Sequence, residues 1–307
     1  MLDTVAVGDI CVDLLTPPLK DFSLGDRQFW VPAMPMVPGG NATNFALGTV
    51  ALGLRTGLAA CIGGDPISEF LRIAVRRARV VSFLVARRGH DAGRTVALTQ
   101  ADGSRTMITY NGANLAFTRP DVAAKALDCR HLHRAGYWWT PKLQGRPTRD
   151  LFRRARDRGA ATSLDVSTDP EGWPDRRRAK VLEVLPEVSV FFGNEVEVRG
   201  VFAARDLKTA ANESSALGVE VLAVHRGPRG CSLFLRRRRV DVPAFRVAPR
   251  NPTGAGDLFN AGFVYARLQG WDLWRSGRFA NAVAARHLEG QNPYPKRSEV
   301  DRQFPSR

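Results

Sequence analysis

The sequence predicts an α/β domain built on a mostly parallel sheet, with helices on both of its faces. Short apolar runs that are typical of buried strands alternate along the 307 residues with longer segments of helical periodicity. The chain is long enough to bury a large core, and neither an internal repeat nor a long low-complexity linker divides it. We therefore expect residues 1–307 to form one domain.

The expected strands are short apolar runs, and the expected helices show apolar residues at intervals of three and four. Strands are predicted at Val5–Val12, Gly57–Ile62, Val80–Val85, Thr95–Thr99, Thr106–Tyr110, Ala161–Leu164, Val188–Phe192 and Val221–Val224, with a hairpin at Cys231–Leu235 and Val240–Phe245. Helices are predicted at Phe45–Leu54, Ile67–Arg77, Pro147–Arg158, Leu207–Leu217 and Asp257–Gln269, and a loosely ordered tail from Asn292 onward. Ligands bind at the carboxyl ends of parallel strands, so polar residues that follow such strands are site candidates: Asp13, Asp165 and Asn194.

The segment Asn251–Asp257, with the sequence Asn-Pro-Thr-Gly-Ala-Gly-Asp, carries the clearest chemical pattern. Small residues at the start of an apolar helix leave backbone N–H groups unpaired, and the helix dipole adds partial positive charge. Such a loop binds an anion, usually a phosphate. A carboxylate at Asp257 is repelled by phosphate, but it suits a general base that takes a proton from an attacking hydroxyl. A glycine-rich turn with an aspartate near the N-cap is the alternative interpretation.

A second glycine motif, Pro38-Gly-Gly-Asn-Ala-Thr-Asn44, directly precedes an expected helix near the N-terminus. The glycines Gly39 and Gly40 allow the backbone to approach a ligand closely. The side chains of Asn41 and Asn44 offer both donors and acceptors, which suit sugar hydroxyls. The two motifs together supply a hydroxyl-binding site and a phosphate site, and this combination indicates a kinase.

Seven parts of the chain carry a resemblance to one family, in that family's order. They are Val5–Asp13, Gly39–Asn44 with Gly57–Asp65, Asp102–Asn114, Phe192–Glu197, Gly227–Gly230, Asn251–Asp257 and Asn281–Ala285. The chain thereby resembles the ribokinase-type (PfkB) family of carbohydrate and nucleoside kinases over nearly its whole length. The resemblance implies a ribokinase-like three-layer α/β/α fold with a mostly parallel central sheet and a small β-sheet lid. It also implies transfer of the γ-phosphate of ATP, with Mg²⁺, to a hydroxymethyl group of a sugar.

The resemblance also implies roles for individual residues. Asp257 would be the general base, and the backbone N–H groups of Gly254, Ala255 and Gly256 would form an anion hole for the developing charge. Acceptor hydroxyls would be held by Asp13, Gly39, Gly40, Asn41 and Asn44. Nucleotide contacts would come from Asn194, Glu197, His225, Gly227, Arg229, Gly230 and Asn281, with Glu197 holding Mg²⁺ through water. The alternatives are a turn cap for Asp13, a solvated helix position for Glu197 and a packed strand end for His225.

Residues 14–37 are rich in proline, with Pro17, Pro18 and Pro32 among them, and carry a turn signal at Gly25–Asp26, which indicates a two-stranded excursion from the α/β core. In the family that the chain resembles, a lid is built here and around residues 95–110. It covers the acceptor and often pairs with a second subunit. Apolar residues in this segment would need cover, either from closure over the substrate or from a dimer, and we expect a homodimer through the lid. They are Phe29, Trp30, Met34 and Met36.

Three positions depart from the family pattern. Asn251-Pro252 stands in place of Asp-Thr, and in potassium-activated members that aspartate helps to bind the ion, so a monovalent cation is doubtful here. His225 stands where Thr or Lys is usual, which would weaken a phosphate contact or make it pH-dependent. Asn41 stands where ribokinases proper carry Lys, so ribose itself is not favoured.

The acceptor stays open at the level of sequence. An unphosphorylated sugar is the first expectation and a nucleoside the second. Tyr137-Trp-Trp139 and the loop Asp165–Trp173 either border the acceptor pocket or belong to the core. Arg27 or Arg105 would suit a phosphate or carboxylate on the acceptor, so sugar phosphates and sugar acids also stay open. A catalytically silent sugar-binding relative is a further alternative, against which the intact Asp257 argues.

The formal net charge of +15 raises the alternative of a nucleic-acid-binding protein. The arginine clusters are dispersed and lack interleaved aromatic residues, so we expect no nucleic-acid partner, although a positive field would attract ATP. No apolar run approaches a membrane span, and the N-terminus resembles a first strand rather than a signal peptide. The four scattered cysteines lack metal-ligand spacing and are expected to be reduced thiols in a cytoplasmic protein.

Overall fold

The strands gather into one large sheet and two small ones in the computed structural model, which describes residues 1–19, 25–26, 28–100, 105–236, 238–250, 252–290 and 292–303. The large sheet of the described residues has nine strands, in the order β15-β14-β13-β12-β11-β10-β1-β4-β6. Their pairings are parallel except for β13–β14 and β14–β15. The strands are β1 Leu2–Val7, β4 Thr56–Ala59, β6 Val81–Ser82, β10 Cys129–Arg134, β11 Ala161–Asp165, β12 Val190–Asn194, β13 Val221–His225, β14 Cys231–Leu235 and β15 Arg238–Val242.

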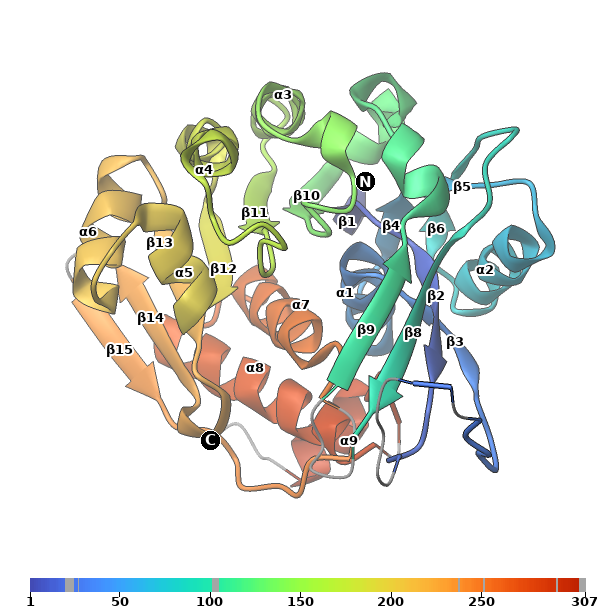
Figure 1. Ribbon diagram of the computed structural model, residues 1–307. Helices are drawn as coiled ribbons and strands as arrows, with labels where there is room; N and C mark the ends of the chain where they lie inside the picture. Colours follow the sequence, from blue (N-terminus) through green and yellow to red (C-terminus); the bar gives the residue numbers. More distant parts are fainter. Residues whose placement is uncertain are drawn as a thin grey trace.

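Helices cover both faces of this sheet, so the predicted three-layer α/β/α arrangement is confirmed (Figure 1). Side chains alternate across β1: Val5 and Val7 belong to one apolar cluster, with residues of α3 to α6, and Ala6 belongs to the other, with residues of α1, α2, α7 and α8. The helices are α1 Asn41–Ala51, α2 Pro66–Arg77, α3 Arg146–Arg156, α4 Asp175–Leu182, α5 Glu195–Phe202, α6 Leu207–Ala216, α7 Ala255–Leu268, α8 Leu273–Leu288 and α9 Arg297–Gln303.

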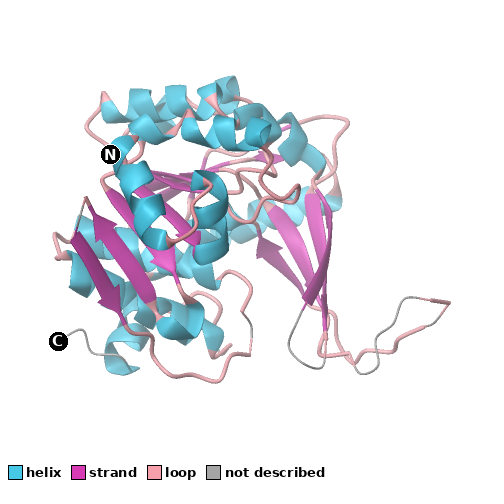
Figure 2. Ribbon diagram, turned by 60° about the vertical axis from the view of Figure 1, so that its left-hand side comes forward, coloured by secondary structure: helices cyan, strands magenta, loops and turns pink. Residues whose placement is uncertain are grey.

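A separate small sheet stands to one side of the three layers (Figure 2). Its strand order is β3-β2-β8-β9, with β3 Met36–Gly39, β2 Cys11–Leu15, β8 Gly93–Thr99 and β9 Arg105–Tyr110. Gly25 and Asp26 are exposed bends in the long connection between β2 and β3. Arg27, the side chain of Arg105 and the start of the Asp102–Asn114 segment lie outside the described residues.

Three of the predicted strands are wrong as single elements, because the chain passes from one sheet to another inside each of them. The run Val5–Val12 divides at Gly8 into β1 of the large sheet and β2 of the small one, so Asp13 lies within β2 rather than after the first strand. The run Gly57–Ile62 likewise divides into β4 of the large sheet and β5 Cys61–Ile62. The run Val80–Val85 divides into β6 of the large sheet and β7 Val85–Ala86, and β5 and β7 pair in a separate two-stranded sheet.

The central strand β10 was not predicted, because its sequence Cys-Arg-His-Leu-His-Arg is polar. Its histidines are nevertheless buried, and the hydroxyl of Ser163 on β11 lies 2.7 Å from Nε2 of His131 and 2.7 Å from Nδ1 of His133. Burial lowers the pKa of both imidazoles, that of His131 to about 3, so both stay neutral. Buried polar groups that are paired in this way are compatible with a sheet interior.

Residues 292–303 of the segment that was expected to be loosely ordered are built into the fold instead. Asn292 donates from Nδ2 to Glu299 at 3.1 Å, α9 packs against α8, and Val300 is fully buried. For these residues the prediction was wrong, because the packing against α8 depends on an element outside the segment and leaves no local pattern in the sequence. Within the described ranges, none of the helices combines the length and the apolar character that crossing a membrane requires.

Candidate active site

The glycine loop before α7 places a left-handed glycine at the N-cap of the helix. Gly254 is the N-cap residue of α7 and has a φ of 84°, a left-handed conformation that favours glycine. A side chain here would also meet Asn44, since a Cβ on Gly254 would lie 3.2 Å from its Nδ2. The N–H of Ala255 makes a long contact of 3.4 Å with the carbonyl of Pro252. Asn251, the first residue of the predicted signature, lies outside the described residues.

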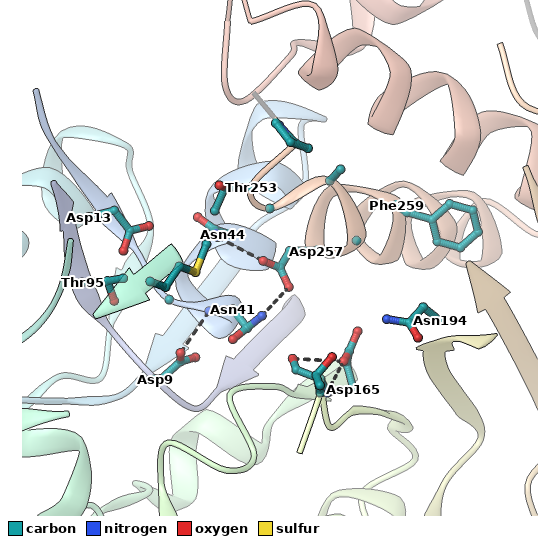
Figure 3. Close-up of a pocket in the computed structure, with 18 of the residues that line it drawn as sticks. Asp9, Asp13, Asn41, Asn44, Thr95, Asp165, Asn194, Thr253, Asp257 and Phe259 are labelled. Atoms are coloured by element: carbon teal, nitrogen blue, oxygen red, sulfur yellow. Dashed lines mark hydrogen bonds between the residues drawn. The ribbon is translucent and has the colours of Figure 1, made fainter. Parts of the chain in front are cut away.

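Asp257, in the first turn of α7, is buried and held by both asparagines of the N-terminal glycine motif (Figure 3). Asn41 donates from Nδ2 to Oδ1 at 3.2 Å, and Asn44 donates from Nδ2 to Oδ2 at 3.0 Å. Burial, reinforced by the charge of Asp165, raises the pKa of Asp257 well above its usual range, and the two amide donors oppose this shift. The two predicted motifs therefore meet at the proposed base.

The N-terminal motif is positioned by an aspartate that the sequence analysis did not single out. Asp9, directly after β1, accepts hydrogen bonds from the backbone N–H groups of Asn41 at 3.1 Å and Ala42 at 3.0 Å. These are otherwise unpaired groups of the first turn of α1, so Asp9 caps that helix from the connection between β1 and β2. Gly39 leaves room for Asp13, because a Cβ there would come within 2.2 Å of Oδ2 of Asp13.

One cavity of about 780 Å³ lies between the small sheet and the carboxyl ends of the large sheet's strands. The predicted site residues that line it are Asp13, Gly40, Asn41, Asn44, Asn194, Glu197, His225, Gly227, Gly230, Gly254, Ala255, Gly256, Asp257 and Asn281. Residues from the small sheet that sequence analysis did not name are Cys11, Thr95, Ala97, Met107, Thr109 and Tyr110. Among the described residues that line the cavity, none is an arginine or a lysine.

The Asn194–Glu197 element forms a capping box at the start of α5. Oδ1 of Asn194 accepts from the N–H groups of Val196 and Glu197, while Oε2 of Glu197 accepts from the N–H of Asn194 at 2.7 Å. Oε1 of Glu197 accepts from Thr168 at 2.8 Å. The alternative of a solvated helix position is therefore wrong for Glu197, which is buried. The Nδ2 of Asn194 points into the cavity (Figure 3).

His225 lies at the end of β13 and is a packed histidine that also lines the cavity. Its ring stacks on Phe192 and meets Phe259 edge-on, and Nε2 lies 2.9 Å from Oδ1 of Asn260. Burial lowers the pKa of His225, although the nearby charge of Glu197 opposes this shift. The imidazole is therefore neutral near pH 7 and supplies no positive charge for a phosphate.

Asp165, at the end of β11, is one of four buried carboxyls among the described residues that line the cavity, together with Asp9, Glu197 and Asp257. Its Oδ2 accepts from Nδ2 of Asn260 on α7 at 2.7 Å, and its Oδ1 accepts from the N–H of Ser167 at 2.8 Å. Burial is the main cause that raises the pKa of Asp165 and that of Glu197. Oxygen donors of this kind suit Mg²⁺, which commonly binds through one or two carboxylates, waters and substrate phosphates.

No group of three or more His, Cys, Asp or Glu in the described part of the chain is arranged to hold a metal. A metal ion bound by protein groups alone therefore does not fit this site. A metal ion held through water by Asp165 and Glu197 does fit, because both oxygens of Glu197 already accept hydrogen bonds from the protein. A cation there would also reduce the repulsion between these two carboxyls, which raises the pKa of Glu197.

Three predicted contacts are not brought into the cavity. Arg229 pairs with Glu195 on α5 and is not a lining residue. Gly39 lies behind Gly40 and is also not a lining residue. Of Tyr137-Trp-Trp139, the first two side chains are core, and only Trp139 lines the cavity. Tyr137 and Trp138 pack edge-on at 5.0 Å, and Trp138 packs on Trp173 at 5.9 Å, so this part of the Asp165–Trp173 loop is also core.

The C-terminal segment contributes a residue that sequence analysis missed. The hydroxyl of Tyr294 donates to Oδ1 of Asn44 at 3.0 Å, on the side of the amide opposite to the one that holds Asp257. Burial raises the pKa of Tyr294 far above its usual range, so the hydroxyl keeps its proton. Only the spatial position of the segment identifies Tyr294, since no local motif surrounds it.

Comparison with known proteins agrees with this geometry. Residues 1–296 match the model of the pfkB family of carbohydrate kinases. An uncharacterized sugar kinase of Archaeoglobus fulgidus is 29% identical over 248 residues, 79% of this chain and 95% of that protein. A nucleoside kinase of Methanothermobacter thermautotrophicus is 27% identical over 310 residues, 98% of this chain and 95% of that protein.

The fold is shared with solved structures as well. The crystal structure of a probable sugar kinase from Rhizobium etli superposes with a TM-score of 0.86 at 24% identity, over 100% of this chain and 99% of that one. This likeness confirms the predicted ribokinase-like fold. The sequence resemblance is confirmed by the match to the family over nearly the whole chain. The chain therefore belongs to the pfkB family of carbohydrate kinases.

Proposed function

We propose that this kinase transfers the γ-phosphate of ATP to a primary hydroxyl of an uncharged sugar, with Asp257 as the general base. The observation that carries the proposal is the position of Asp257. Its carboxylate is held by Asn41 and Asn44, and it shares one cavity with the backbone of Gly254–Gly256 at the start of α7. A desolvated base and a set of backbone N–H donors beside each other suit phosphoryl transfer.

In the proposed step, the acceptor hydroxyl gives its proton to the carboxylate of Asp257 while its oxygen bonds to the γ-phosphorus. The bond from that phosphorus to the bridging oxygen of ADP breaks, and ADP leaves. The N–H groups of Gly254–Gly256 would donate to the oxygens of the transferred phosphoryl group. Removing one such donor typically costs about 2.7–4 kcal/mol of transition-state stabilisation. Asn41 and Asn44 donate to the ionised form of the base and so favour it.

The nucleotide end of the cavity would be formed by Asn194, Gly227, Gly230 and Asn281, with His225 as a packed neutral wall. The amide of Asn194 would donate from Nδ2 to a phosphate oxygen. Asp165 and Glu197 would hold Mg²⁺ through water, and bound Mg²⁺ would neutralise the charge of the nucleotide phosphates. Activation by a monovalent cation is not expected, because Asn251 brings no anionic oxygen to the loop.

An uncharged acceptor is favoured by the charge of the cavity. Asp9, Asp13, Asp165, Glu197 and Asp257 all line it, and none of the described lining residues is cationic. A phosphate or carboxylate on the acceptor would be repelled there. A nucleoside is the second candidate for the acceptor. Two observations favour it: one relative is a nucleoside kinase, and the aromatic ring of Trp139 lines the cavity.

We also propose that the protein forms a homodimer through the small sheet. Met36, Met107, Ile108 and Tyr110 are all exposed on its strands β3 and β9, and Trp30, in the connection before β3, is 92% exposed. Apolar side chains clustered on one small sheet are commonly covered by a partner surface in solution.

The first test is an ADP-release screen with MgATP against sugars, sugar acids, sugar phosphates and nucleosides, with Asp257→Asn in parallel. We expect turnover with an uncharged acceptor, lowered by a factor on the order of 10²–10⁴ in Asp257→Asn while ATP binding remains. The matched control is Asp175→Asn, also in a helical first turn but with a 96% exposed side chain, which should keep full activity. Near wild-type turnover of Asp257→Asn would exclude Asp257 as the base. ATP binding without turnover on any acceptor would favour a silent relative.

A further inference from the structure

His287, in the last turn of α8, makes an unusual pair of contacts. It is buried, and both of its ring nitrogens face backbone carbonyl oxygens. Nε2 lies 2.7 Å from the oxygen of Thr253, in the glycine loop, and Nδ1 lies 2.6 Å from the oxygen of Pro293, in the C-terminal segment. Both distances are those of direct hydrogen bonds.

This geometry determines the charge of the ring. A neutral imidazole has one N–H donor and one acceptor nitrogen, whereas a carbonyl oxygen can only accept. With an oxygen at each nitrogen, a neutral ring would place a nitrogen lone pair against an oxygen at 2.6 or 2.7 Å. Turning the ring over would put C–H groups at those distances, well inside the roughly 3.3 Å of a C–H···O contact. Only the doubly protonated imidazolium satisfies both contacts.

The charged groups around His287 come from each element packed near it. On α8, Arg286 and Glu289 form an ion pair with each other. On α7, Asp257 lies three residues after Gly254, and the side chain of Arg250 lies against Gly290, just after α8. Tyr294 follows Pro293 and keeps its proton, since burial raises its pKa. The direct hydrogen-bond partners of the imidazolium are thus the two peptide carbonyls.

The bond to Thr253 has a consequence for the phosphate site. The C=O of Thr253 and the N–H of Gly254 belong to one planar peptide unit, so they point in opposite directions. His287 is not a lining residue of the cavity, whereas Thr253 and Gly254 are. Holding the carbonyl from behind therefore directs the N–H of Gly254 toward the cavity. A charged donor on the carbonyl also polarises the peptide and strengthens its N–H as a donor.

We propose that His287 is an imidazolium in the native protein and a positioning residue for the anion hole, which it holds between α8 and the C-terminal segment. The role in turnover rests on the proposed kinase function, whereas the charge state does not. The bond to the carbonyl of Pro293 also fixes the segment that presents Tyr294 to Asn44. One protonated ring thereby connects both halves of the site.

The charge state is tested by long-range ¹H–¹⁵N correlation spectra of protein labelled in its five histidines, with His287→Gln used to assign the signal. In the folded protein under the conditions of the activity assay, we expect both ring nitrogens of His287 to carry protons, because each lies at hydrogen-bond distance from a carbonyl oxygen. The pattern of either neutral tautomer under those conditions would overturn the proposal, whatever the enzyme's activity.

The positioning role is tested by the kinetics of His287→Gln and His287→Phe. Gln retains donor and acceptor groups without charge, as a neutral imidazole does, and Phe keeps the ring without donors. We expect both variants to lose about tenfold or more in kcat with little change in acceptor KM, because the anion hole acts mainly on the transition state. Thermal unfolding identifies any loss caused by unfolding. Wild-type kcat in a folded His287→Gln would overturn the role, whereas absence of turnover in the wild type would count against the proposed function instead.

Discussion

The hydroxyl of Tyr294 offers a quantitative test of how the base is held. It donates to Oδ1 of Asn44 at 3.0 Å, and Nδ2 of the same amide donates to Oδ2 of Asp257 at 3.0 Å. The tyrosine therefore selects the amide orientation in which the NH₂ group faces the base. Tyr294→Phe removes only this hydroxyl and keeps the ring that packs in the segment after α8.

The expected size of the effect follows from the type of hydrogen bond. A neutral hydrogen bond contributes about 0.5–1.5 kcal/mol net, which corresponds to about a 2- to 13-fold loss of kcat/KM if the whole amount orients Asn44. Asn44→Ala removes a donor to an ionised carboxylate, worth about 1.5–3 kcal/mol, and so about a 13- to 160-fold loss. The base itself remains in both variants.

A double-mutant cycle decides whether Tyr294 acts through Asn44. If it does, Tyr294→Phe should lower kcat/KM in the wild-type background and change nothing further in the Asn44→Ala background. The matched control is Tyr265→Phe, whose hydroxyl accepts a hydrogen bond from Arg297 at 2.6 Å outside the cavity and whose loss should leave kcat/KM unchanged. The reasoning is refuted if the losses from Tyr294→Phe and Asn44→Ala multiply in the double variant.

Two further predictions concern pH and assembly. Burial raises the pKa of Asp257, so its carboxylate forms at a higher pH than that of an ordinary aspartate, and kcat/KM should rise with pH through that raised pKa. Asn41→Ala removes a donor to the carboxylate and should therefore move this rise in kcat/KM to higher pH. A pH–rate profile in which Asn41→Ala leaves the rise in place would contradict this role of the amide. For assembly, Ile108→Lys, at a 62% exposed position of β9, should convert the dimer to a monomer by light scattering, and a monomeric wild type at micromolar concentration would exclude the dimer.

The same raised pKa has a consequence for stability. Because the folded protein binds the proton of Asp257 more tightly than the unfolded chain does, ionisation of this carboxyl opposes folding. The unfavourable contribution develops as pH rises from the ordinary aspartate pKa toward the raised one, and it is full above both. The site therefore holds its base at the expense of stability, as desolvated catalytic groups commonly do.

The sequence by itself determined the class of fold and the two glycine loops from which the proposed site is built. Alternating apolar runs predicted the parallel sheet with helices on both faces, because burial on both sides of a sheet favours nearly continuous apolar strands. Gly254 and Asp257 could be identified because a left-handed N-cap and a first-turn carboxylate are local properties of a loop and the helix that follows it.

Only the tertiary structure decided which residues meet. Asp257 and Asn44 are 213 positions apart, and Asp9, His287 and Tyr294 make their contacts with the two glycine motifs from three other segments. The polar strand β10 and the divided strand Val5–Val12 were missed for a related reason: pairing of buried polar groups and passage between sheets depend on distant partners. Local sequence reports what a segment can form, whereas hydrogen-bond partners and burial, which determine charge state and orientation, arise only when the segments are packed together.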